Sequence, residues 1–126
     1  MSCSVEWKEK GLCWTFTGIF SGREMNLVNR NICGDRRFDS IGYQLLDFSG
    51  ATSFDVTEKE VKDAAFQDMV AAKSNPNIKM AAVAPQDIIR KLSEIYAEYS
   101  EPSQWETRIF DTVEDANQWL KSLGLV

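Results

Sequence analysis

The sequence predicts a single α/β domain whose five-stranded sheet is mostly parallel. Strand-like and helix-like segments follow one another along the chain in the order β-β-α-β-α-β-α-β-α. Strands separated by helices usually pair in parallel through right-handed crossovers, so only the first strand is expected to be antiparallel. The run from Ile78 to Ala84 is apolar without alternation, which is typical of an interior parallel strand covered on both faces. With no linker or internal repeat in its 126 residues, the chain is expected to form one domain, residues 1–126.

The first two strands are predicted to form a hairpin. Residues 5–7 make a short edge strand, residues 8–11 a turn, and residues 12–20 the second strand. Large apolar side chains alternate with smaller ones in the second strand. One face should therefore be better buried, and its residues are Leu12, Trp14 and Phe16.

Three of the four helices begin at recognisable capping residues. Ser21 and Thr57 are each followed three positions later by a glutamate, which is the pattern of a capping box, and Thr112 caps the last helix. The first of these helices is expected to end near Gly34 and the second near Lys73. The remaining helix, residues 87–99, has its apolar positions at helical spacing. Those positions are Ile88, Leu92, Ile95, Tyr96 and Tyr99.

The central junction, residues 47–60, is the expected functional region. An apolar strand from Ile41 to Leu46 ends at Asp47, a Ser- and Gly-rich loop follows, and Thr57 opens a helix. In open α/β sheets, ligands and modifications usually act at the carboxyl ends of strands. A last strand is predicted at residues 106–110.

Composition excludes several classes of function. The chain has no histidine, which removes Ser-His-Asp and Cys-His catalysis together with imidazole metal sites. Its three cysteines are widely spaced, without a CxxC pair, and no Rossmann or Walker phosphate loop occurs. The net charge of −5, without a basic run, argues against nucleic acid as a partner. We therefore expect no enzyme activity, no cofactor and no bound metal.

The composition also argues against a membrane protein. No apolar run approaches the roughly 20 residues of a transmembrane helix. Charged residues occupy the positions in residues 1–10 where a signal peptide would be apolar, so the expected location is the cytoplasm.

Several segments together resemble the SpoIIAA-like proteins, which are small bacterial domains related to STAS domains and to anti-sigma-factor antagonists. The resemblance covers nearly the whole chain and rests on residues 11–18, 36–47, 57–73, 79–84 and the ending Phe110 to Leu120. It implies a sheet with helices mainly on one face. It also implies a non-enzymatic regulatory module that binds a protein partner, although this subgroup is largely uncharacterised.

Anti-sigma-factor antagonists carry a phosphorylated serine in an Asp-Ser-Ser-Gly type motif at a helix start. The matching stretch here reads Asp55-Val56-Thr57-Glu58, without the tandem serines and the glycine. Thr57 is the nearest hydroxyl and Ser49 a second phosphorylation candidate, while their simpler interpretations are an N-cap and a turn residue. The expected partner-binding residues are Asp47, Ser49, Gly50, Asp55 and Thr57.

Two other functions remain open. The aromatic residues Tyr96, Tyr99 and Trp105 would line a pocket for a small apolar ligand, as a distant resemblance to lipid-carrying CRAL-TRIO folds suggests, or they belong to the core. Alternatively Asp47, Asp55 and Asp111 would meet at one sheet edge and hold magnesium, as in a receiver domain, or they are turn and capping residues. A homodimer is compatible with an exposed sheet edge.

Overall fold

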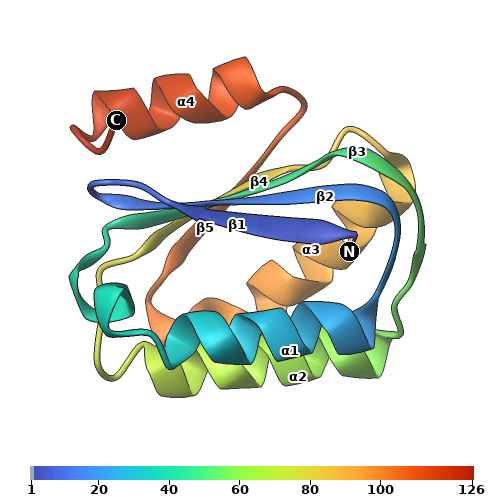
Figure 1. The fold of residues 1–126 in the computed structure, drawn as a ribbon, viewed down its shortest axis with the longest axis horizontal. Coiled ribbons are helices and arrows are strands. Elements are labelled where there is room, and N and C mark those ends of the chain that lie inside the picture. The colour runs from blue at the N-terminus through green and yellow to red at the C-terminus, as the bar shows by residue number, and fades with distance from the viewer. Residues whose placement is uncertain (1) are drawn as a thin grey trace.

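The computed structural model describes residues 2–126, which form one five-stranded sheet with helices on both faces (Figure 1). The strands lie side by side in their order along the chain. The first pair is antiparallel and the other three pairs are parallel, so the sheet is mixed. The strands are β1 (Cys3–Trp7), β2 (Gly11–Ser21), β3 (Tyr43–Asp55), β4 (Lys79–Val83) and β5 (Glu106–Phe110).

Three helices cover one face of the sheet and a fourth covers the other. In Figure 1, α1, α2 and α3 lie on one side of the strands, whereas α4 lies alone on the opposite side. The helices are α1 (Gly22–Cys33), α2 (Glu58–Ala71), α3 (Asp87–Ser100) and α4 (Val113–Ser122), with short 3-10 turns at Arg36–Ser40 and Glu101–Ser103. No helix within residues 2–126 has both the length and the hydrophobicity needed to cross a bilayer.

The sheet separates two hydrophobic cores of unequal size. The larger core lies under α1, α2 and α3, and the predicted face of β2, with Leu12, Trp14 and Phe16, belongs to it. Phe16 stacks on Phe48 of β3 with ring centroids 4.3 Å apart. The smaller core lies under α4 and includes Tyr43 and five further buried residues. Packing of the larger core fixes the positions of α1, α2 and α3 on the sheet.

The prediction that a Ser-Gly-rich loop follows Leu46 was wrong, because β3 continues as a strand to Asp55. The whole segment pairs in parallel with β2, and Asp55 lies opposite Ser21. Two one-residue irregularities accommodate the extra length: Thr15–Thr17 pairs with Asp47–Gly50, and Gly18–Ile19 pairs with Ala51–Ser53. Bulges of this kind bend a strand without ending it.

The predicted apolar stripe of α3 was misplaced at both ends. Ile88 is 59% exposed and Tyr99 41% exposed, whereas Ile89 is buried. The helix therefore turns Ile89, rather than Ile88, towards the sheet. Ile88 and Ile89 are adjacent isoleucines, and the periodicity alone did not distinguish them.

Candidate functional site

The start of α2 is held by a complete capping box. The Thr57 side chain accepts a hydrogen bond from the Glu60 backbone N–H (3.2 Å), and the Glu60 carboxylate accepts one from the Thr57 N–H (2.9 Å). The Thr57 hydroxyl also donates to the same carboxylate at 3.2 Å. Thr57 is exposed, so its predicted N-cap role is confirmed and its hydroxyl still faces solvent.

The start of α1 lies directly beside this capping box. A Cβ placed on Gly22, the first residue of α1, would lie 2.5 Å from the Glu60 carboxyl group. The Asn26 side chain donates to the Glu60 backbone carbonyl at 3.2 Å. The amino-terminal ends of α1 and α2 therefore meet around Glu60, and both helix dipoles present partial positive charge there.

The five expected partner-binding residues do not converge on one point. Asp47 and Ser49 form a pair, in which the Ser49 hydroxyl donates to the Asp47 carboxylate at 2.6 Å. Gly50 packs closely on β2, since a Cβ there would lie 3.2 Å from the Phe16 carbonyl oxygen. Asp55 lies eight positions after Asp47 in the same strand, about 26 Å away when extended. The region 47–60 is thus extended along β3, and Thr57 lies near one end of it.

The far half of β3 forms a sheet edge. Pairing with β4 ends at Asp47, so Phe48 to Asp55 pair with β2 alone. The Gln86 side chain covers part of this edge by donating to the carbonyls of Phe48 and Ala51, both at 3.0 Å. The remaining edge, residues 52–55, is available to a further strand.

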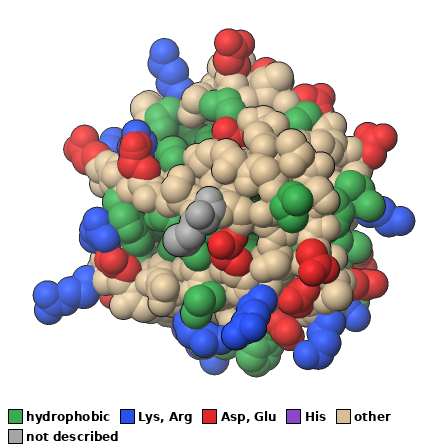
Figure 2. All heavy atoms as spheres, turned by 45° about the vertical axis from the view of Figure 1, so that its right-hand side comes forward, with side chains coloured by type: hydrophobic (Ala, Val, Ile, Leu, Met, Phe, Trp, Pro, Cys, Tyr) green, Lys and Arg blue, Asp and Glu red, His purple; other side chains and the backbone are tan. Residues whose placement is uncertain are grey.

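An exposed isoleucine lies on β2, the strand that pairs with the other side of this part of β3. Ile19 of β2 is 70% exposed and pairs with Ser53 of β3. Figure 2 views the molecule from the side on which β2 and β3 bend, and the centre of this face consists mostly of backbone and uncharged polar side chains. Charged side chains of both signs lie mainly towards its periphery. We call residues 52–57 together with Ile19 the β3 rim.

The three aspartates considered for magnesium are scattered. Asp111 follows β5 and forms an ion pair with Arg90 of α3, whereas Asp47 is bonded to Ser49. Throughout residues 2–126, no three His, Cys, Asp or Glu side chains are grouped so that they could hold a metal ion. The carboxylate-site alternative therefore has no geometric support.

The three cysteines have the character of structural residues. All are free thiols, and Cys3 is buried. Burial raises the pKa of each thiol above its ordinary value, and that of Cys33 reaches about 12. Such thiols are protonated at neutral pH and are therefore poor nucleophiles.

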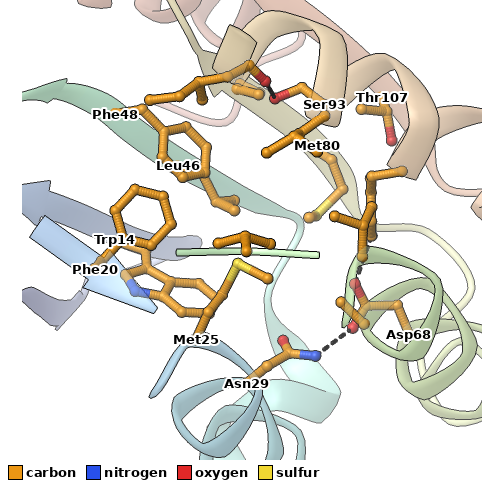
Figure 3. A pocket seen from close by; sticks show the side chains of 18 residues that line it. Trp14, Phe20, Met25, Asn29, Leu46, Phe48, Asp68, Met80, Ser93 and Thr107 are labelled. Atoms are coloured by element: carbon orange, nitrogen blue, oxygen red, sulfur yellow. Dashed lines mark hydrogen bonds between the residues drawn. The ribbon is translucent and has the colours of Figure 1, made fainter. Parts of the chain in front are cut away.

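A cavity of about 80 Å³ lies between the sheet and the three-helix layer. Its lining is mostly apolar, with Trp14, Phe20 and Phe48 among the residues that Figure 3 shows around it. Of the three aromatics predicted to line a pocket, only Tyr96 does so. Tyr99 is 41% exposed and lies beside Lys62, and Trp105 packs against Phe38 outside the cavity.

One carboxyl group lies at the cavity wall. Asp68 of α2 is only 3% exposed and accepts hydrogen bonds from Tyr96 Oη and from Asn29 Nδ2, the latter at 3.0 Å. Figure 3 shows Asn29 and Asp68 pointing towards each other across the space between α1 and α2. Burial raises the pKa of Asp68 to about 6, although the hydrogen bonds from Tyr96 and Asn29 act in the opposite direction.

Sequence reasoning missed Asp68 and Ile19. A polar residue within an amphipathic helix normally faces water, and nothing adjacent to Asp68 in the sequence distinguishes it from the exposed Asp63. One signal was available: Asp68 lies three and four residues after Ala65 and Ala64, on the side of the helix that is poor in bulky residues.

The chain has the SpoIIAA-like, STAS-like α/β fold, as the sequence resemblance implied. No protein-family model matches its sequence, and no curated protein does so either. Among solved structures, the anti-sigma factor antagonist SpoIIAA in its unphosphorylated form is similar at 9% identity and a TM-score of 0.65, with 98% of this chain and 99% of that chain covered.

Two further structures have the same fold. The Bacillus cell fate determinant SpoIIAA in its phosphorylated form matches at 12% identity and a TM-score of 0.60, covering 94% of this chain and 98% of its own. An uncharacterised DUF3478 family protein from Shewanella loihica PV-4 matches at 14% identity and a TM-score of 0.55, covering 94% and 91%. At these identities the similarity is one of fold.

Proposed function

We propose that this protein is a non-enzymatic regulatory module that docks a protein partner along residues 47–60, chiefly at the β3 rim, and that phosphorylation of Thr57 controls the docking. The observation that carries the proposal is the exposed Thr57 hydroxyl at the meeting point of two helix amino termini. The fold shared with both the unphosphorylated and phosphorylated forms of SpoIIAA supports it.

A phosphate on Thr57 would act through Glu60. The Thr57 hydroxyl lies 3.2 Å from the Glu60 carboxylate, and a phosphate would bring roughly two negative charges to that position. Repulsion would break the capping box and displace Glu60 from its place against Gly22. The two helix amino termini would then bind the phosphate in place of the glutamate.

The β3 rim suits an extended segment of a partner. Its unpaired edge offers main-chain donors and acceptors to an added strand. Ile19, which pairs with Ser53 from the neighbouring strand β2, offers an exposed apolar contact one strand away from that edge. Thr57 lies two residues beyond the end of the strand, so a phosphate there would add charge at the end of the docked segment.

The phosphorylation part is tested by intact-mass and peptide mass spectrometry of the protein isolated from its own cells. Phosphate is expected on Thr57 in the wild type, and its absence under every growth condition tested would refute the gating. The Thr57→Ala variant should lack this phosphate. Thr112→Ala is its matched control and should keep the phosphate, because Thr112 is also an exposed threonine N-cap, accepting from the Asp115 N–H at 3.1 Å.

The docking part is tested by affinity purification with Ile19→Glu and Ser53→Arg. A stoichiometric partner should be retained by wild type and by a Glu114→Arg control on α4, and lost by both rim variants. A partner that binds all four proteins equally would place the interface elsewhere. The same preparations, examined by size-exclusion chromatography, would show whether the rim instead pairs two copies of this chain.

The cavity favours a second candidate function, a sensor of a small ligand. Its apolar lining agrees with the ligand class considered from the sequence. However, about 80 Å³ is roughly half the volume of the engineered cavity that accepts benzene. A lipid would require the helices to move apart, so the candidate is restricted to molecules of a few heavy atoms. Native mass spectrometry of the purified protein, with and without added small molecules, tests it.

A further inference from the structure

We infer that the cavity binds a small organic ammonium ion, with the Asp68 carboxylate as its counterion. The inference rests on the second candidate function and narrows it from an apolar ligand to a cationic one. It uses a part of the molecule that is separate from the β3 rim.

The first reason is that Asp68 has no cationic partner in the part of the chain that the structure describes. Its hydrogen bonds come from three neutral groups, the Tyr96 hydroxyl, the Asn29 amide and, at 4.0 Å, the Cys33 thiol. No Lys or Arg in residues 2–126 forms an ion pair with it. A buried carboxylate without a countercharge is costly, so a cation bound beside it would stabilise its ionised form.

The second reason is the hydrogen-bonding capacity that remains. An ionised carboxylate has about four lone-pair positions. Asn29 and Cys33 approach Oδ1 and Tyr96 approaches Oδ2, which leaves one position on Oδ2 for an N–H donor of an ammonium group. On the sheet side of the cavity, Thr107 Oγ1 is buried and has no hydrogen-bond partner within the described chain. It supplies a further acceptor in the lining of the cavity.

The third reason is the rest of the lining. The aromatic side chains of Trp14, Phe20 and Phe48 surround the cavity together with aliphatic ones (Figure 3). Aromatic faces attract cations, and aliphatic side chains accommodate a short alkyl group. The volume of about 80 Å³ restricts the ligand to a few heavy atoms. A short primary alkylammonium has the required charge, donors and size.

Binding of such an ion should depend on pH through Asp68 alone. The titratable groups that face Asp68 are Cys33 on α1 and Tyr96 on α3, and burial raises the pKa of both, so they stay neutral below pH 8. The sheet residues of the cavity are not titratable. Because Asp68 must lose its proton, affinity should be constant above its pKa of about 6 and fall about tenfold per pH unit below it.

The experiment is an NMR titration of the full chain with n-propylammonium chloride and, separately, with the neutral analogue n-propanol. Wild type should bind the ammonium at pH 7.5 about tenfold or more tightly than the alcohol, with shift changes around the cavity. Binding at pH 4.5 should be at least tenfold weaker. Asp68→Asn should lose the preference for the ammonium, while Asp63→Asn, an exposed carboxylate on the same helix, should retain it.

Two results distinguish failure of the ammonium specificity from failure of the small-ligand sensor. If both compounds bind wild type and Asp68→Asn equally, the ammonium specificity is refuted and the small-ligand sensor survives. If neither compound causes shifts at the cavity, both are refuted. Ala64→Val, which adds volume to the cavity wall while keeping Asp68, should abolish binding of both compounds. This variant and the pH series remain decisive even if Asp68→Asn does not fold.

Discussion

The free energy of unfolding of wild type should contain a contribution from Asp68 that is lost as the pH rises from 4 to 6. Replacement of Asp68 by asparagine should remove this pH dependence. Asparagine keeps the size of the side chain, an oxygen that can accept from Asn29 and an amide N–H that can donate to Tyr96 Oη, but it carries no charge. The Asp68 pKa is raised from 3.8 to about 6 in the folded protein. The folded state therefore holds its proton over a range in which the unfolded state has released it, so this group favours folding at low pH. That contribution is complete below pH 4, declines as the pH rises to 6, and is absent above it.

The size of this effect follows from the pKa shift. About two pKa units at 1.36 kcal/mol each give about 3 kcal/mol, and complete burial means that solvent screening does not reduce it. We take an m-value of about 1.5 kcal/mol per molar urea. The urea midpoint of the variant minus that of wild type should then be about 2 M larger at pH 7.5 than at pH 4.

Urea unfolding followed by tryptophan fluorescence at pH 4, 5, 6 and 7.5 measures this difference. Other carboxyl groups act in the opposite direction, such as Asp35, whose pKa its hydrogen bonds with Arg37 lower to about 2. They are common to both proteins and cancel in the comparison. Asp63→Asn is the control and should follow wild type. A constant difference between wild type and Asp68→Asn across this range would refute the reasoning.

Three local features can be tested by further substitutions and urea unfolding. Thr57→Ala and Thr112→Ala should each cost about 1 kcal/mol, because each removes the acceptor for an N3 N–H; an unaffected Thr57→Ala would mean that the capping box contributes nothing. Gly11→Ala should cost about 1–3 kcal/mol, because its Cβ would lie 2.4 Å from the buried Tyr43 ring, whereas Gly34→Ala, with its nearest atom at 3.4 Å, should be tolerated. Gln86→Ala should cost about 1–2 kcal/mol, because it leaves two β3 carbonyls without their donor, and equal stability of Gln86→Ala and the exposed Gln118→Ala would contradict that role.

Local signals predicted most of the fold. Ser21, Thr57 and Thr112 marked helix starts because an N-cap needs only a side-chain oxygen and the next few residues. The far half of β3 was missed because Ser49, Gly50 and Ser53 have the composition of a loop. Its strand conformation comes from pairing with β2, across the whole of α1 in the sequence.

The candidate site was less predictable than the fold. Thr57 was identified because capping and modification both depend on a residue at a helix end. Asp68 depends on Asn29 and Tyr96, which are 39 and 28 residues away along the chain, and no local pattern connects them. The prediction for Tyr99 was wrong because helical spacing indicates one face of a helix without fixing where that face ends.

The sheet order, identical to the order along the chain, bears on how the polypeptide folds during synthesis. In a doubly wound sheet the strand order reverses, so strands are added at both edges of the growing sheet. Here each strand leaving the ribosome finds its partner already made, and none has to insert between two earlier strands. A nascent chain ending after α2 already contains β1, β2 and β3 in their native pairing, so the protein can grow by adding one strand at a time to a single open edge.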